Sequence, residues 1–267
     1  MSGVGSSMQT NETENAMAKI KTVHGVKEHK VVSPKVWLAA RKRLLVKEKK
    51  FSKLRDQLNQ QRRELPWVPV EKDYAFDTES GTKTLADLFD GRSQLLVYHF
   101  MFGPPYEAGC PVCTSIGGTL AAQVPHLQAR DTTLLLASRA PLDRLLGYRE
   151  RMGWGIGWVS MQSSDFNRDI GFLNTEAELK PWLESGAIPP TVEQNAEMCG
   201  TDVVGYVTEG PGMSAYTLSD GTVYRTYVST ARGLEFAMTY YGLLDRTAKG
   251  RAEDASEPMW LRRHDEY

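Results

Sequence analysis

The sequence predicts an α/β fold built around a mainly parallel sheet, and three observations lead to that prediction. Apolar runs of strand length alternate with helix-like segments along most of the chain, which is typical of α/β proteins. Residues 95–102 are apolar on both sides, as expected of a strand buried within a parallel sheet. Two β-rich runs then flank Asp220-Gly221, a dipeptide that favours a hairpin turn. The sheet should therefore end in an antiparallel hairpin.

Composition excludes several classes of protein. The 267 residues have room for one large domain with extensions. A net charge of −1 gives no electrostatic case for a nucleic-acid partner. No apolar run approaches the roughly 18 residues that span a bilayer, and three cysteines are too few for a disulfide-stapled secreted domain. We therefore expect a cytoplasmic protein with neither a membrane nor a nucleic-acid partner.

The chain is predicted to begin with a disordered tail over residues 1–32 and a basic helical arm over residues 33–66. The first 17 residues are polar and lack the apolar core of a secretory signal. Ser33-Pro34 is typical of a helix start, and Leu65-Pro66 of a helix end, so a helix is expected over residues 34–64. Residues 18–65 hold 15 Lys and Arg but 4 Asp and Glu, a balance of +11, and the rest of the chain carries about −12.

An apolar stripe follows this helical arm. Its members recur at intervals of seven and are Trp37, Leu44, Phe51, Leu58 and Leu65. A coiled coil needs a second apolar position in each heptad, and here Lys47 and Gln61 occupy two of those positions. The pattern therefore does not favour a regular coiled coil. We expect the stripe to pack on the body or on a second copy of the chain, as in a homodimer. Basic amphipathic helices can also bind membranes or nucleic acids, a less favoured interpretation here.

The main domain is predicted over residues 67–236, with an insert at 174–212 and a C-terminal extension at 237–267. The expected elements are a strand at 74–76, a turn and short helix at 81–89, strands at 95–102, 132–137 and 156–159, helices at 114–130, 141–152 and 175–184, loops holding Cys199, and a hairpin of strands 214–218 and 223–227. A Cys-x-x-Cys after a central strand, with a terminal antiparallel hairpin, predicts a thioredoxin-like three-layer sandwich.

Cys110-Pro111-Val112-Cys113 carries the clearest chemical signal. Two cysteines three residues apart at a helix start can form a disulfide. The unpaired N–H groups and partial positive charge of the helix N-terminus stabilise a thiolate on the leading cysteine. We therefore expect Cys110 to be the attacking thiol, the more exposed of the two, and Cys113 the resolving thiol.

A zinc site is a competing interpretation of the same motif. It would need two further ligands, and the chain offers no second Cys-x-x-Cys and no paired histidines. Cys199 is the remaining cysteine, and His99 lies within a predicted strand, where a lone histidine is more often a core residue. Redox chemistry is therefore favoured over metal binding and over inert thiols, and no cofactor or metal is expected.

The chain resembles a bacterial and fungal family described as predicted dithiol–disulfide oxidoreductases with a thioredoxin-like fold. The resemblance extends over residues 33–267 and rests on WLAAR at 37–41, RRELPW at 62–67, VYHFMFG at 97–103, GCPVC at 109–113, SRAP at 138–141, RMGW at 151–154, SDFN at 164–167 and WLRRHDEY at 260–267. It implies a thioredoxin-like fold and a redox-active cysteine pair, with a protein or small-molecule thiol or disulfide as substrate.

The chain differs from ordinary thioredoxins in two places. Thioredoxins have a cis-proline next to the dithiol, whereas the nearest candidate here, Pro211, is about one residue out of register, and no cis bond is assigned to it. Residues 103–109 also form a longer lip before the cysteines. Glu107 within this lip should raise the pKa of Cys110, against the effect of the helix dipole.

A second resemblance, to peroxiredoxins, is carried by PVCT at 111–114 and SDFNR at 164–168. It implies that Cys113 attacks a peroxide and that Arg139 stabilises its thiolate. Cys110 would then replace the usual threonine. Tyr106 stands where the usual proline is expected, which weakens this resemblance.

Other residues could line the site, each with a structural alternative. The candidates are Arg139, Trp154, Trp158, His99 and Tyr106. Arg139 follows a predicted strand but could pair with a surface carboxylate, and the two tryptophans could simply be core residues. Cys199 could exchange with the disulfide, although a structural thiol is favoured. The charged end of the chain, residues 262–267, suits docking on a neighbouring subunit.

The sequence is compatible with three functions. The favoured one is a cytoplasmic thiol–disulfide oxidoreductase using Cys110 and Cys113. The alternatives are a peroxiredoxin-like thiol peroxidase, and an interaction protein in which the helical arm and the C-terminal extension assemble partners while the thiols are not catalytic.

Overall fold

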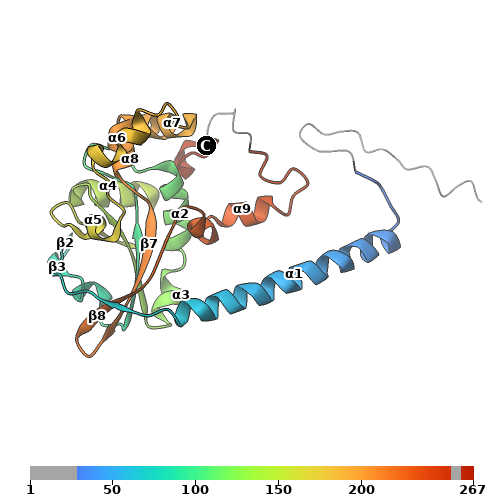
Figure 1. Cartoon of the computed structure of the whole chain (residues 1–267), viewed down its shortest axis with the longest axis horizontal. Helices are drawn as coiled ribbons and strands as arrows, with labels where there is room; N and C mark the ends of the chain where they lie inside the picture. Colours follow the sequence, from blue (N-terminus) through green and yellow to red (C-terminus); the bar gives the residue numbers. More distant parts are fainter. Residues whose placement is uncertain (1–28, 254–259) are drawn as a thin grey trace, which may run out of the picture.

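The computed structural model describes residues 29–253 and 260–267 and has the predicted thioredoxin-like α/β fold (Figure 1). One sheet of eight strands has the order β1-β8-β7-β4-β5-β6-β2-β3. The strands are β1 (Val68–Pro69), β2 (Ala75–Thr78), β3 (Gly81–Thr84), β4 (Gln94–His99), β5 (Thr132–Ser138), β6 (Gly157–Ser160), β7 (Gly212–Ser219) and β8 (Thr222–Thr230).

The centre of the sheet confirms the expected topology. Strands β4, β5 and β6 are parallel neighbours, and β4 pairs on its other side with β7 in the antiparallel sense. The hairpin of β7 and β8 turns at Asp220 and Gly221, whose φ angles of 49° and 77° fit the predicted turn. Because β4 is central, the loop that follows it emerges in the middle of one sheet edge.

Alternation along the central strands divides the core into two layers. Tyr98 and Phe100, and Leu134 and Leu136 of β5, face a cluster that contains the cysteines. Neighbouring residues such as Val97 face the opposite side. Helices α2 (Pro111–Ala121), α3 (Val124–Gln128) and α4 (Leu142–Met152) cover the first face, and the short helices η2 (Asp87–Phe89) and α5 (Phe166–Ile170) cover the second.

The single helix predicted over residues 114–130 is wrong in two respects. Helix α2 already begins at Pro111, because proline is well suited to a first helical position. It ends at Ala121, and a separate helix α3 follows, with Pro125 in its first turn. Proline has no N–H to continue the ladder of α2, which explains the break.

The structure also contains elements that the sequence did not predict. Residues 81–84 form strand β3, paired with β2, where a turn had been expected. The insert holds α6 (Glu176–Leu183), close to its expected bounds, and also α7 (Pro190–Met198) and α8 (Val203–Thr208), where loops were expected. Cys199 therefore directly follows a helix, as its C-cap residue.

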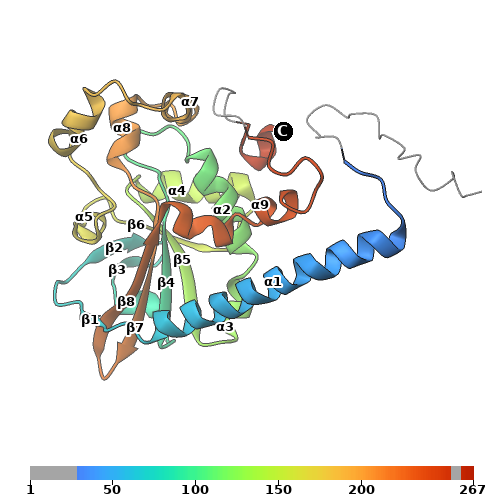
Figure 2. The same cartoon turned by 45° about the vertical axis from the view of Figure 1, so that its right-hand side comes forward.

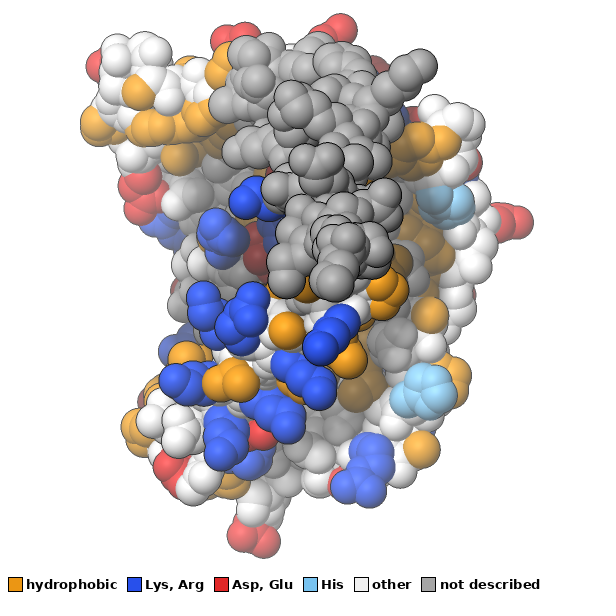
Figure 3. Space-filling view, turned by 90° about the vertical axis from the view of Figure 1, so that its right-hand side faces the viewer, with side chains coloured by type: hydrophobic (Ala, Val, Ile, Leu, Met, Phe, Trp, Pro, Cys, Tyr) orange, Lys and Arg blue, Asp and Glu red, His pale blue; other side chains and the backbone are white. Residues whose placement is uncertain are grey.

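The helical arm is α1 (Pro34–Arg63), capped by the Ser33 side chain as predicted. It extends from one edge of the sheet away from the body (Figure 1 and Figure 2), and none of its residues is buried. Docking of the stripe on its own body is therefore wrong. Trp37, Leu44, Phe51 and Leu58 are 42% to 66% exposed. Lys and Arg side chains gather on the side of the molecule from which α1 extends (Figure 3).

The C-terminal extension packs on its own chain, and the docking of its charged end on a neighbouring subunit stays a prediction. It includes the 3₁₀ helix η3 (Ala231–Ala237), which begins just before it, α9 (Thr239–Leu244) and the short helix η4 (His264–Glu266). Arg151 of α4 binds Asp265 at 2.7 Å and Glu266 at 3.1 Å. The charges of the last residues are thus used within the same molecule.

We expect Leu44→Glu combined with Phe51→Glu to change the mass of the protein measured by light scattering. Exposed apolar side chains of this size favour a covered state, for which a second copy of the chain is our candidate. Gln57→Glu with Gln60→Glu is the matched control, since it adds the same two charges to α1 with little change in helix propensity. A wild-type protein that is monomeric at all concentrations would contradict this prediction.

Candidate active site

Cys110 occupies the position immediately before helix α2. The chain leaves β4, forms the lip of residues 103–109, and returns to the sheet edge, where the Cys110 N–H donates to the carbonyl of Met101 at 3.1 Å. The Cys110 carbonyl accepts the first helical hydrogen bond, from Thr114 N–H at 2.8 Å. The sulfur therefore lies at the positive end of a helix packed on the sheet.

The three cysteines form one cluster with free thiols, and no disulfide joins them. Hydrogen bonds from the thiols of Cys113 and Cys199, together with one from Tyr206, hold the pKa of Cys110 well below its usual range. The Tyr206 hydroxyl oxygen is 3.4 Å from the Cys110 sulfur. These donors outweigh the effect of burial, so Cys110 is the member of the cluster that loses its proton most readily.

The other two thiols are stabilised in the protonated form. Burial, followed by the hydrogen bond to Cys110, raises the pKa of Cys113 well above its usual value. The hydrogen bond to Cys110, followed by burial, raises the pKa of Cys199. A thiolate flanked by two thiols is the charge distribution required for one sulfur to attack and another to resolve.

Two expectations about Cys110 are wrong. It is not the more exposed thiol, because Cys110 and Cys113 are each 1% exposed and Cys199 is 0% exposed. Lip residues and the insert cover Cys110, which the sequence did not reveal. The pKa of Cys110 is lowered and not raised, and the Glu107 side chain is exposed and packs against Gly200.

A cavity of about 360 Å³ borders Cys110 and Cys113. It lies between α2, the Tyr98 side of the sheet and the C-terminal segment. Its lining is largely apolar and includes Met101, Val112, Ile116, Tyr206, Pro211, Leu234, Met238 and Tyr241, with Arg232 and Glu235 as its charged residues. No peptide bond in the described residues is cis, so Pro211 lines this cavity with a trans bond.

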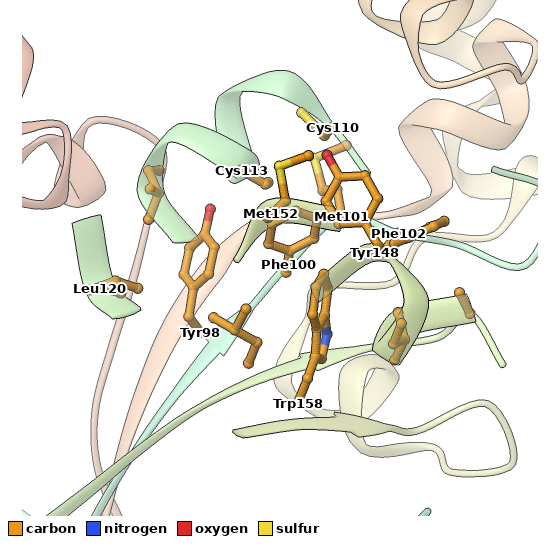
Figure 4. Close-up of a cluster of buried hydrophobic side chains, with 14 of the residues drawn as sticks. Tyr98, Phe100, Met101, Phe102, Cys110, Cys113, Leu120, Tyr148, Met152 and Trp158 are labelled. Carbon is orange, nitrogen blue, oxygen red and sulfur yellow. The ribbon is translucent and has the colours of Figure 1, made fainter. Parts of the chain in front are cut away.

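Tyr98 provides a polar group on the sheet side of the cavity. Its side chain points from β4 toward the helix of the cysteines (Figure 4). The hydroxyl is buried and has no hydrogen-bond partner among the residues that the structure describes. A polar group of this kind is available to a molecule that enters the cavity.

Tyr106, one of the predicted site residues, supports Tyr206. The two rings are stacked with centroids 6.0 Å apart, and the Tyr106 hydroxyl donates to the Tyr206 carbonyl at 2.6 Å. Burial raises the pKa of both phenols above the usual value, so both remain protonated donors. Tyr106 thus acts on Cys110 through Tyr206.

Arg263 fastens the C-terminal end over the cysteine cluster. Its guanidinium donates to the Gly109 carbonyl at 2.7 and 3.0 Å, and to the Met198 carbonyl at 2.7 Å. These carbonyls belong to the residues that precede Cys110 and Cys199. One buried side chain therefore ties together the two segments that carry these thiols.

The two predicted tryptophans lie behind the helix of the cysteines, in the aromatic core. Trp158 is buried, donates to the Ser138 hydroxyl at 3.1 Å, and lies 4.7 Å from Phe100 between ring centroids (Figure 4). Trp154 packs so closely on Gly117 that a Cβ there would be 2.8 Å from the indole. They support α2 and do not line the cavity beside the thiols.

His99 and Arg139 lie elsewhere, in a buried polar chain. His99 is on the opposite side of β4 from Tyr98, bonded to Asn167 at 2.6 Å and Ser214 at 2.7 Å. Arg139 pairs with Glu209 at 2.9 Å, and Glu209 also bonds Asn167. The alternation of β4 explains the placement of His99, and the buried Glu209 carboxylate explains that of Arg139.

The arrangement therefore contains functional residues that sequence reasoning missed. Tyr206 lies in none of the quoted motifs, whereas Tyr98 and Arg263 lie in VYHFMFG and WLRRHDEY, where no site role was assigned to them. Tyr206 and Arg263 reach the cysteines from distant segments, so no local spacing could have identified their roles. No group of three or more metal-binding side chains suited to an ion is found among residues 29–253 and 260–267, and no helix there is long and apolar enough to cross a bilayer.

The family model described as "Bacterial protein of unknown function (DUF899)" matches residues 26–267. The chain belongs to this family. The match covers the whole span over which the sequence resemblance was recognised. No protein with a curated description matches the chain.

Several solved structures are similar at low sequence identity. A cysteine-to-serine mutant of PrxQ from Xylella fastidiosa has a TM-score of 0.40 and 12% identity, covering 66% of this chain and 94% of that chain. Peroxidoxin BcpB from Mycobacterium tuberculosis has a TM-score of 0.42 and 10% identity, covering 66% and 94%. The bacterioferritin comigratory protein of Xanthomonas campestris has a TM-score of 0.39 and 14% identity, covering 65% and 96%.

We expect Tyr206→Phe to raise the pKa of Cys110 by about one unit, because a hydrogen bond to a charged group contributes about 1.5–3 kcal/mol. The measurement is the rate of Cys110 alkylation against pH, with the modified peptide identified by mass spectrometry. Tyr216→Phe is the control, since Tyr216 is equally buried on the opposite face of the sheet. An unchanged alkylation profile in Tyr206→Phe would contradict the assigned contact.

We expect acid to destabilise the fold through His99. Burial lowers the pKa of His99 from 6.5 to about 4, so between these pH values the histidine binds a proton in the unfolded chain but not in the folded one. The free energy of unfolding is therefore highest above pH 6.5 and falls by about 3 kcal/mol as the pH drops to 4. Chemical unfolding against pH should show this loss in the wild type and in the exposed control His126→Gln, and a smaller loss in His99→Gln. Equal losses in all three proteins would refute the role of His99.

Proposed function

We propose that this protein is a thiol–disulfide oxidoreductase in which Cys110 attacks and Cys113 resolves. One observation carries the proposal: Cys110 receives hydrogen bonds from two thiols and a tyrosine hydroxyl, at a helix N-terminus beside a cavity. A structural thiol needs no such set of donors. The lowered pKa of Cys110 and the raised pKa of Cys113 support the division of roles.

The reaction would proceed by two exchanges. The Cys110 thiolate attacks one sulfur of a substrate disulfide, forming a mixed disulfide and releasing the other substrate sulfur as a thiolate. That thiolate takes the proton of Cys113, and the new Cys113 thiolate attacks the Cys110 sulfur. The second substrate thiol leaves with a proton from water, so one substrate disulfide is reduced and one Cys110–Cys113 disulfide is formed.

The protein groups around the sulfur have distinct parts in this reaction. Tyr206, kept protonated by burial, donates to the Cys110 sulfur, and Tyr106 fixes its position. The largely apolar cavity admits a substrate group to Cys110 and Cys113. Because both sulfurs are buried, a small disulfide suits the cavity better than a disulfide within a folded protein.

A thiol peroxidase is the second candidate, favoured by the largely apolar cavity of about 360 Å³ beside the buried Cys110. A hydroperoxide would then oxidise Cys110 to a sulfenic acid and would itself be reduced to an alcohol. The Cys113 thiol would condense with the Cys110 sulfenic acid, forming the disulfide and releasing water. The earlier assignment of Cys113 as the attacking sulfur finds no support in its surroundings. Arg139 is paired with Glu209, and the Thr114 hydroxyl bonds the Cys110 carbonyl at 2.8 Å.

The proposal is tested by incubating the protein with defined ratios of reduced and oxidised glutathione. We expect a reversible loss of two free thiols in the wild type, with a Cys110–Cys113 crosslink found by peptide mapping. Cys110→Ser should show no intramolecular disulfide. A wild type that retains all three thiols would contradict the proposal and favour an interaction protein.

Peroxide consumption separates the two redox candidates and the two sulfurs. A disulfide exchanger reduces small disulfides much faster than hydroperoxides, and loses this activity in Cys110→Ser. If Cys110→Ser keeps fast peroxide reduction while Cys113→Ser abolishes it, then Cys113 is the attacking thiol and Cys110 is not.

A further inference from the structure

Cys199 is a buried nucleophile for which the proposed reaction has no use. It comes from the insert, about 90 residues after the other two cysteines, yet it is 0% exposed and lies in the same cluster. We propose that Cys199 is a second resolving thiol, which attacks the Cys110 sulfur and moves the disulfide from Cys113 to itself. This inference rests on the proposed function of the same site.

The backbone holds Cys199 against the lip that leads to Cys110. Its carbonyl accepts hydrogen bonds from the N–H groups of Glu107 at 2.8 Å and Ala108 at 3.3 Å. The Glu107 side chain packs on Gly200 so closely that a Cβ there would be 2.6 Å from a carboxylate oxygen. The two segments are therefore joined at the Cys199 carbonyl and at Gly200, the residue that follows it.

Arg263 adds a third connection between these segments. Its guanidinium binds the carbonyls of Gly109 and Met198, the residues directly before Cys110 and Cys199. Because the planar guanidinium binds both carbonyls, the backbone segments that carry Cys110 and Cys199 have little freedom to separate. The fold thus keeps the Cys199 thiol at the Cys110 sulfur, where it hydrogen-bonds.

The proposed exchange is balanced without an external oxidant. Cys199 loses its proton and its sulfur attacks the Cys110 sulfur of the Cys110–Cys113 disulfide. The bond between Cys110 and Cys113 breaks, the bond between Cys110 and Cys199 forms, and Cys113 leaves as a thiolate that takes up the proton. One disulfide is exchanged for another, and the oxidation state of the protein is unchanged.

The exchange would have a spatial consequence. The cavity is lined by Cys110 and Cys113, but Cys199 does not border it. Moving the disulfide to Cys199 therefore returns a free Cys113 thiol to the cavity and places the disulfide beside the Arg263 contact. The protein would have two oxidised states that differ in which thiol faces the substrate.

The test is peptide mapping of disulfides in the full-length protein equilibrated with oxidised glutathione, since counting thiols does not distinguish the two crosslinks. We expect both the Cys110–Cys113 and the Cys110–Cys199 crosslinks in the wild type. In Cys113→Ser, and in Cys113→Ala should the first variant fold poorly, the Cys110–Cys199 crosslink should become the main intramolecular disulfide. Cys199→Ser should form only the Cys110–Cys113 crosslink.

Two further variants test whether the geometry is responsible. Arg263→Lys should lower the ratio of Cys110–Cys199 to Cys110–Cys113 crosslinks in an otherwise native chain. Arg151→Gln, which breaks exposed ion pairs to Asp265 and Glu266 but leaves both carbonyl contacts, should not change this ratio.

The failures of the two proposals have different signatures. If Cys113→Ser gives only a glutathione mixed disulfide on Cys110, Cys199 is not a resolving thiol, while the proposed function stands. If neither intramolecular crosslink forms in the wild type, the proposed function fails as well.

Discussion

Cys110 is 1% exposed, and a thiolate in such a place is stable only when hydrogen-bond donors replace the water that it has lost. The fold provides these donors from different parts of the chain. The start of α2 contributes Cys113, and the insert contributes Cys199 and Tyr206. The insert, an addition to the α/β core, thus contributes two of the three side-chain donors to Cys110.

The surrounding packing keeps these donors in place. Tyr106 supports Tyr206 from the lip, and Arg263 holds the backbone on either side of the cluster. A buried guanidinium is costly unless its N–H groups are paired, and here two carbonyls and Glu266 bind it. The end of the chain is therefore part of the site.

Much of the fold could be predicted from the sequence, because it depends on local patterns. The apolar run before the cysteines predicted β4, Asp220-Gly221 predicted the hairpin, and Ser33-Pro34 predicted the start of α1. Helices α7 and α8 were missed, since their short sequences have no clear apolar periodicity. The pair Cys110 and Cys113 was also predictable, whereas Tyr206 reaches Cys110 from 96 residues away. His99 and Arg139 were misplaced because their partners Asn167 and Glu209 are tertiary neighbours.

The central claim is that the pKa of the buried Cys110 thiol lies well below its usual range, and titration of thiolate ultraviolet absorbance in the reduced protein tests it most directly. The account predicts one thiolate in the wild type that forms well below the usual pKa range of cysteine. It should be absent from Cys110→Ser and present in the Cys199→Ala and Cys113→Ala variants, with a raised pKa because each of these alanine variants lacks one donor. A wild type without such a thiolate, or a thiolate that persists in Cys110→Ser, would contradict the account.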